Sequence, residues 1–251
     1  MYRKIRAIQH QQLLKKIVMI RLIFLLLLPS LSFSQTFFEN VNQFLIKNVH
    51  DGKIDYQLLK EAPTELDNLI LGISEFYLNR QDQDFKTAFY INAYNLLVIK
   101  QVTDNYPIQS PMDIEGFFKV NEFSVAGEMI TLDEIEFRKL IEPTQDPRIH
   151  FALGCAAKSC PFLYDQAYTP QHIQQQLHFR AQLIIDRPNY VQVNQGTREV
   201  VLNKIFDWYQ DQFVFTEESI LGYINKYRFY SVPEEYEVKF QEYDWSLNSS
   251  R

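Results

Sequence analysis

The chain has 251 residues, of which 46% are apolar and 22% are charged, and its formal net charge is −6. This composition is typical of a globular protein and excludes a wholly disordered chain. The surplus of acids argues against general nucleic-acid binding, which needs a basic surface. Two cysteines are too few for a disulfide-dense scaffold.

Residues 1–34 have the pattern of a secretory signal peptide. They carry six basic residues and no acid, then the apolar run Leu22 to Leu28, and small residues up to Ser34. The run is shorter than the about 20 residues that a membrane-spanning helix needs. An uncleaved anchor is the alternative, and Met19 is a second candidate for the true start. No cysteine follows the expected cleavage site, so we do not expect a lipid-anchored protein.

We therefore predict a signal peptide over residues 1–34 and a single globular domain over residues 35–251. The predicted location is the periplasm or the exterior of the cell, where disulfides persist. Loss of the six basic residues takes the net charge from −6 to −12. This charge disfavours nucleic acid and anionic membrane surfaces as partners. We expect no stable membrane insertion after cleavage.

The first half of the domain is predicted to be mainly helical. Helices are predicted over 36–49, 57–60, 64–74 and 85–103, and apolar residues recur at helical spacing in the first and third of these ranges. The last of them is apolar on all faces, which predicts a central, buried helix. Asp51-Gly52 is a turn signal, and residues 117–130 alternate like a hairpin with Ala126-Gly127 in its turn. Thr131 to Glu134 resemble a capping box that opens a helix to about Ile141.

The second half mixes short strands with helices. Residues 148–153 are a candidate strand, and residues 154–169 are a predicted loop with small side chains. Thr169-Pro170 is predicted to begin a helix that ends near Ile185. The remaining predictions are a hairpin, two helices and a final strand: 190–193 with 199–202, 204–212, 217–227 and 236–241. The fold class is therefore α+β, a helix-rich single domain with short antiparallel strands and hairpins.

The segment from Asp146 to Pro161 holds both cysteines and His150. One hypothesis is a thiol nucleophile at Cys160 or Cys155, with His150 as its base. Lys158 would lower the pKa of the thiol, and Asp146 would orient the imidazole from the same face of the candidate strand. A second hypothesis is a structural disulfide, which the predicted compartment favours. Two buried free thiols are a third. We expect no metal site, because a fourth ligand is missing.

Two further features bear on function. Asn92 and Asn95 are spaced i, i+3 on the buried helix, so they share a face. Their amides either tie down the backbone of a neighbouring loop or line a pocket, where one would orient His150 as in Cys-His-Asn hydrolases. The segments 206–209 and 243–246 each combine Trp, Tyr and Asp. They are either core or the lining of a groove for a sugar or a peptide.

Several segments resemble the family called domain of unknown function 547, which includes bacterial envelope proteins and plant proteins. The segments that carry the resemblance are Phe89-Tyr90-Ile91-Asn92-Ala93-Tyr94-Asn95, Thr131-Leu132-Asp133-Glu134-Ile135-Glu136, Asp146-Pro147-Arg148-Ile149-His150-Phe151-Ala152-Leu153, Ser159-Cys160-Pro161 and Tyr243-Asp244-Trp245-Ser246-Leu247-Asn248. Tyr90 departs from the family, which often has Trp there. The resemblance implies a single family domain but no assigned activity. It directs attention to these residues: Asn92, Asn95, Arg148, His150, Cys155 and Cys160.

Two functions are compatible with these patterns. The first is a thiol-dependent hydrolase or acyl transferase with Cys160, Cys155, His150 and Asn92 as catalytic residues. In this hypothesis the binding residues are Asn95, Arg148 and Lys158. The second is a non-enzymatic periplasmic binding or interaction module, with an aromatic-lined groove and a structural Cys155–Cys160 disulfide. Its expected partner is a small molecule or a peptide, and neither function requires a cofactor.

Overall fold

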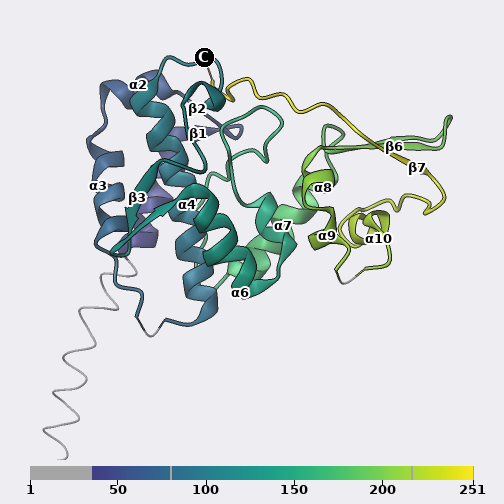
Figure 1. Ribbon diagram of the computed structural model, residues 1–251, viewed down its shortest axis with the longest axis horizontal. Helices are drawn as coiled ribbons and strands as arrows, with labels where there is room; N and C mark the ends of the chain where they lie inside the picture. Colours follow the sequence, from purple (N-terminus) through teal and green to yellow (C-terminus); the bar gives the residue numbers. More distant parts are fainter. Residues whose placement is uncertain (1–35, 80, 216, 251) are drawn as a thin grey trace, which may run out of the picture. The chain divides into compact units, whose positions relative to one another are not determined.

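The computed structural model describes residues 36–79, 81–215 and 217–250 (Figure 1). The predicted signal peptide lies outside the described residues. Among the described residues, about 47% are helical and 13% are strand, which confirms a helix-rich α+β fold. Among the described residues, no helix combines the length and the apolar character that crossing a membrane requires.

The chain divides into two compact units, Met1–Asn40 and Val41–Arg251. Residues 36–48 are helical, as predicted. The other helices, the strands and the candidate site all belong to the unit Val41–Arg251.

The helix α4, Gln83–Asn105, is the centre of this unit, and α2 (Tyr56–Glu61) and α3 (Thr64–Ser74) pack against it (Figure 1). Asp82 caps its first turn, since its carboxylate accepts a hydrogen bond from the Phe85 amide at 2.8 Å. Buried side chains lie on all faces of α4. The prediction of a central, buried helix is therefore confirmed.

Two small antiparallel hairpins flank the helices. Their strands are β1 (Val49–His50), β2 (Lys53–Ile54), β3 (Glu122–Val125) and β4 (Glu128–Thr131). Both predicted turns are present. Asp51 and Gly52 have φ of 50° and 73°, and Ala126 and Gly127 have φ of 51° and 81°. Positive φ at both central residues is the geometry that two-residue hairpin turns favour.

A continuous helical run follows β4, and its middle is wound as a π-helix. It comprises α5 (Leu132–Glu134), η2 (Ile135–Ile141) and α6 (Glu142–Thr144). The predicted helix is confirmed, but the π turns are not visible in its hydrophobic pattern. Because π segments are rare and often occur at functional sites, this run is a candidate location for a functional site.

The predicted strand 148–153 is wrong: residues Pro147–Phe151 form the 3-10 helix η3. Asp146 caps it, with Oδ1 accepting a hydrogen bond from the Arg148 amide at 3.0 Å. Pro147 stands at the first helical position, where its fixed φ suits a helix. A short apolar run does not distinguish a buried strand from a buried helical turn, and here the cap and the proline decide.

The second half of the unit contains the predicted hairpin and final strand, in a three-stranded sheet. Its strands are β5 (Val191–Asn194), β6 (Glu199–Leu202) and β7 (Glu237–Phe240). The pair β5–β6 is antiparallel, whereas β7 pairs parallel to β6. This parallel pair departs from the predicted antiparallel arrangement, because β7 enters the sheet after a long helical excursion and not through a hairpin.

The helices of this half are shorter than predicted. They are α7 (Ile173–Ile185), α8 (Ile205–Trp208), α9 (Gln210–Phe213) and α10 (Ile220–Asn225). The first half also contains the 3-10 turn η1 (Pro111–Asp113), which was not predicted. Tyr209 separates α8 from α9, so the single helix predicted there is broken. The core beneath them is aromatic, with the rings of Phe151, Phe206 and Phe213 packed at centroid distances of 5.1 to 5.8 Å.

Candidate functional site

A pocket of about 400 Å³ lies within the unit Val41–Arg251. It is reached by α4, the helical run after β4, η3, the cysteine loop (residues 154–169), α8 and the C-terminal segment (residues 243–250). Its lining residues are Tyr94, Phe118, Lys119, Asp133, Glu136, Phe137, His150, Leu153, Cys155, Cys160, Pro161, Ile205, Trp208, Tyr209, Tyr243 and Trp245.

One wall of the pocket, which we call the aromatic wall, consists of Phe118, Trp208, Tyr243 and Trp245. The ring centroid of Tyr243 lies 4.7 Å from that of Trp208 and 4.6 Å from that of Trp245. The two indoles stack at 5.9 Å, and Phe118 extends the wall at 6.3 Å from Trp245. Trp208 is 46% exposed and Trp245 is partly exposed. These rings, which include both tryptophans of the chain, are therefore not simply core.

The C-terminal segment brings two of these rings to the pocket by running along the cysteine loop. The Ser159 amide donates to the Asp244 carbonyl at 3.2 Å, and the Asp244 amide donates to the Ser159 hydroxyl at 2.9 Å. In extended backbone, alternate side chains share a face. Tyr243 and Trp245 are alternate residues, and both line the pocket.

Two carboxylates at the start of the helical run form an acidic edge of the pocket. The predicted capping box is confirmed: the Glu134 amide donates to Thr131 Oγ1 at 3.2 Å, and the Thr131 amide donates to Glu134 Oε2 at 3.0 Å. This N-terminal cap fixes the direction in which each side chain of the helical run points. Asp133 and Glu136, spaced i, i+3, both line the pocket.

The charge of Asp133 is only weakly compensated. Its Oδ1 lies 3.9 Å from Nζ of Lys119, whose side chain is 78% exposed, and such a solvent-exposed ion pair is weak. Burial raises the pKa of Asp133 above its usual range, Lys119 opposes that rise, and the Glu136 carboxylate adds to it. Lys119 is the only lysine or arginine among the lining residues.

His150 is buried at the back of the pocket, between an acid and an amide. Its Nδ1 lies 3.1 Å from Glu136 Oε1, and its Nε2 lies 2.7 Å from Gln212 Oε1. The ring stacks on Tyr209, with centroids 3.8 Å apart. The contacts with the Glu136 carboxylate and the Gln212 amide group hold the ring in one orientation. Burial, assisted by Glu136, raises the pKa of Tyr209, so its hydroxyl stays protonated.

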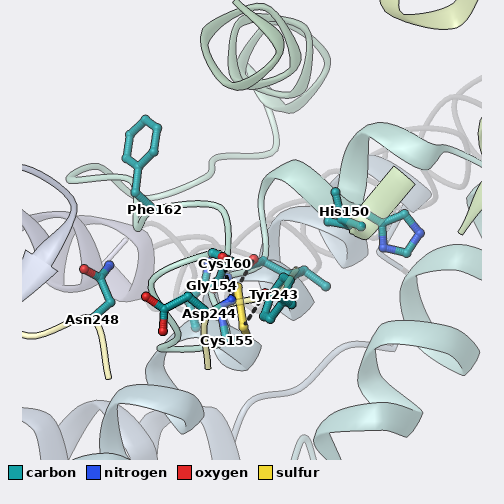
Figure 2. Close-up of a disulfide and its surroundings, with 12 residues drawn as sticks. His150, Gly154, Cys155, Cys160, Phe162, Tyr243, Asp244 and Asn248 are labelled. Carbon is teal, nitrogen blue, oxygen red and sulfur yellow. Dashed lines mark hydrogen bonds between the residues drawn. A yellow bond between two sulfur atoms is a disulfide. The ribbon is translucent and has the colours of Figure 1, made fainter. Parts of the chain in front are cut away.

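Cys155 and Cys160 form a disulfide, with their Cα atoms 5.8 Å apart. The Cys155 amide donates to Cys160 Sγ at 2.7 Å. The Tyr243 hydroxyl lies 3.2 Å from Cys155 Sγ, and it is the donor because a disulfide sulfur carries no hydrogen. Figure 2 shows the Tyr243 ring beside the disulfide. The hydrogen bond from Tyr243 therefore links the disulfide, and with it the cysteine loop, to the aromatic wall.

The predicted Cys–His dyad is not assembled in this structure. The two sulfurs are bonded to each other, so neither offers a thiolate. The imidazole of His150 points away from the disulfide (Figure 2), and both of its nitrogens have other partners. Asp146, expected to orient His150, instead pairs with Arg148, since the strand that would have aligned Asp146 with His150 is a 3-10 helix.

Asn92 and Asn95 hold the two ends of the cysteine loop against α4. Asn92 Nδ2 donates to the Tyr168 carbonyl at 2.7 Å, and the Tyr168 amide donates to Asn92 Oδ1 at 3.1 Å. Asn95 Nδ2 donates to the Ala152 carbonyl at 2.9 Å, and the Gly154 amide donates to Asn95 Oδ1 at 2.8 Å. This is the loop-bracing alternative. The prediction that an asparagine orients His150 is corrected: Glu136 and Gln212 contact that ring.

The predicted binding residues Arg148 and Lys158 are not among the lining residues. Arg148 forms a two-pronged ion pair with Asp146, at 2.9 Å and 2.6 Å, and Nη2 also donates to Gln174 Oε1 at 2.6 Å. It therefore ties η3 to α7. Lys158 is exposed, and its amide donates to the Ser246 carbonyl at 2.9 Å.

Four polar residues of the site were not singled out in the sequence: Asp133, Glu136, Tyr209 and Gln212. A signal exists for the first two, because an i, i+3 pair of acids begins within the capping box. Tyr209 belongs to the aromatic segment 206–209. Gln212 carried no signal, since an isolated glutamine in a predicted amphipathic helix is ordinarily a surface residue.

Among the described residues, no three His, Cys, Asp or Glu side chains are grouped as metal ligands would be. The family model described as "Protein of unknown function, DUF547" matches residues 78–183. This segment belongs to the DUF547 family. The resemblance inferred from the motifs is thus confirmed over α4 to α7. The DUF547 segment contains the acidic edge, His150 and the disulfide, whereas Trp208, Tyr243 and Trp245 follow it. Searches of curated proteins and of solved structures find no match.

Proposed function

We propose that the domain is a binding module that holds a small organic molecule in the aromatic-lined pocket. The observation that carries this proposal is the aromatic wall around a cavity of about 400 Å³. Small-molecule sites are typically concave, apolar and aromatic, have volumes of roughly 300–1,000 Å³ and contain a few placed polar groups. Asp133, Glu136 and His150 are such groups here.

The disulfide supports binding over thiol catalysis. It closes the cysteine loop behind the pocket and receives a hydrogen bond from Tyr243, so it fixes part of the wall. Thiol-dependent hydrolysis or acyl transfer is the second candidate, because Cys155, Cys160 and His150 line the same pocket. That reaction requires a two-electron reduction of the disulfide and release of the His150 ring from Glu136 or Gln212.

A neutral fluorescent probe tests the binding proposal. We expect N-phenyl-1-naphthylamine to bind the full-length protein saturably with one site, with energy transfer from the two tryptophans. Trp208→Ala removes one ring of the wall. Because an aromatic contact contributes about 0.5–1.5 kcal/mol beyond the area it buries, the dissociation constant of the probe should rise roughly two- to tenfold.

The matched control is Phe229→Ala, which removes an aromatic ring that is 81% exposed and not among the lining residues. It should leave the affinity unchanged. Probe emission that never saturates, or that falls equally in the two variants, would contradict a pocket-based binding module.

We also propose that the protein is exported to the periplasm or secreted. The support is the pattern of residues 1–34 together with the disulfide, a bond that persists mainly outside the cytosol. The expected mature N terminus is Gln35. Intact-mass measurement of protein recovered from the native cell fraction would read it directly, and a retained leader would count against the proposal.

A further inference from the structure

We propose that the ligand of the pocket is a small organic cation, a quaternary or substituted ammonium, held between the aromatic wall and Asp133. This inference rests on the proposed binding function and names the chemical class of its ligand. It follows from three features of the pocket: partly exposed aromatic rings, a poorly compensated carboxylate beside them, and the sign of the surrounding charge.

The aromatic wall is partly exposed, since Trp208 is 46% exposed and Trp245 is partly exposed. Indole and phenol faces carry negative potential and attract ammonium groups within about 6 Å of the ring centre, and Trp is the strongest of them. In the described chain, Arg180 lies over the rings of Phe162 and Tyr164, Arg187 lies over Phe162, and Lys204 lies over Phe240. No cation of the described residues therefore lies over Trp208 or Trp245.

Asp133 lies next to this wall. Its amide donates to the Phe118 carbonyl at 2.9 Å, and the Phe118 ring packs against Trp245. Among the described residues, its carboxylate has only Lys119, 3.9 Å away, as an ionic partner, whereas Glu136 contacts His150. A cation that entered beside the wall would supply the missing counter-charge and would favour the ionised form of Asp133.

Other ligand classes fit this electrostatic arrangement less well. An anion would face Asp133 and Glu136 across a partly desolvated space, where like charges repel strongly. A neutral sugar would stack on the wall but would desolvate Asp133 further without compensating its charge. The predicted mature chain has a net charge of −12, so its field draws cations towards the surface and repels anions.

Choline and its neutral isostere 3,3-dimethylbutan-1-ol separate charge from shape. Each is titrated into the full-length protein at constant ionic strength, and binding is followed by displacement of N-phenyl-1-naphthylamine and by tryptophan emission. Both tryptophans belong to the wall, so their emission reports on the pocket. We expect choline to bind about tenfold more tightly than the alcohol, the scale of a desolvated cation–π contact.

Asp133→Asn keeps the shape of the side chain and removes its charge. It should weaken choline binding by about threefold or more while leaving the alcohol and the naphthylamine unaffected. Glu134→Gln is the control, because it removes the neighbouring charge outside the pocket lining and glutamine also serves in a capping box. It should leave choline binding unchanged.

Equal affinity for choline and the alcohol would overturn the inference, as would Asp133→Asn and Glu134→Gln variants that bind choline alike. The binding proposal would survive either result, provided that the naphthylamine still binds saturably. If the naphthylamine does not bind either, the proposed function itself fails.

Discussion

The residue that most directly secures the cysteine loop is Arg180 on α7, which is almost fully buried. Its Nε and Nη2 donate to the Phe151 carbonyl at 3.2 Å and 3.1 Å, and Nη2 also donates to the Phe162 carbonyl. The guanidinium therefore joins the two flanks of the disulfide, whereas Asn95 on α4 holds only the flank that precedes Cys155. Its Nη1 has no hydrogen-bond partner among the described residues, so ordering the loop outweighs incomplete pairing of a buried charge.

We predict that Arg180→Met destabilises the protein by roughly 2–4 kcal/mol, because two buried carbonyls lose their donor and methionine supplies none. Urea unfolding, extrapolated linearly to water, measures this loss. Arg187→Met is the matched control. Arg187 is exposed and follows the end of α7. Its guanidinium carbon lies 3.9 Å from the centroid of the Phe162 ring, which Arg180 also contacts. Loss of the Arg187 side chain should lower the free energy of unfolding by about 1 kcal/mol or less. Equal destabilisation in the two variants would show that the hydrogen bonds of Arg180 do not secure the cysteine loop.

At the scale of elements, the sequence predicts best where one local signal dominates. The helix α3 follows from apolar periodicity, α4 follows from a long apolar run that begins after a polar break, and both short hairpins follow from turn residues that tolerate positive φ. The prediction failed at η3, where four apolar residues looked like a strand and a single Asp-Pro cap favoured a helical turn. The break between α8 and α9 at Tyr209 depends on tertiary packing, which the apolar periodicity of the sequence does not reveal.

The candidate site was only half predictable, for a related reason. Cysteines, histidine and aromatic clusters are visible because they are rare or concentrated. Their roles depend on which side chains meet, and those meetings join residues far apart in the chain. His150 meets Gln212 over 62 positions, and Cys155 meets Tyr243 over 88. The π-helix η2 adds a further difficulty, since its winding shifts the face on which Glu136 falls relative to an ordinary helix.

For the whole molecule, the pocket is a product of the unit Val41–Arg251 and not of its DUF547 segment alone. Residues 78–183 supply the acidic edge, His150 and the disulfide. Three of the four rings in the aromatic wall come from later in the chain, and two of those belong to the C-terminal segment. That segment also pairs with β2, where the Ser250 amide donates to the Ile54 carbonyl at 3.0 Å. The last residues therefore close the domain and complete the site together.

We predict that a chain ending at Glu242 binds N-phenyl-1-naphthylamine about tenfold more weakly than the full chain, because it lacks two of the four rings of the aromatic wall. A chain ending at Asn248 retains Tyr243 and Trp245 and serves as the control, with an affinity close to that of the full chain. Circular dichroism checks that both truncated chains keep their helices, which lie before residue 226. Full affinity in a folded chain that ends at Glu242 would show that the C-terminal segment does not form the wall. Loss of affinity in both truncated chains would instead trace the effect to the pairing with β2.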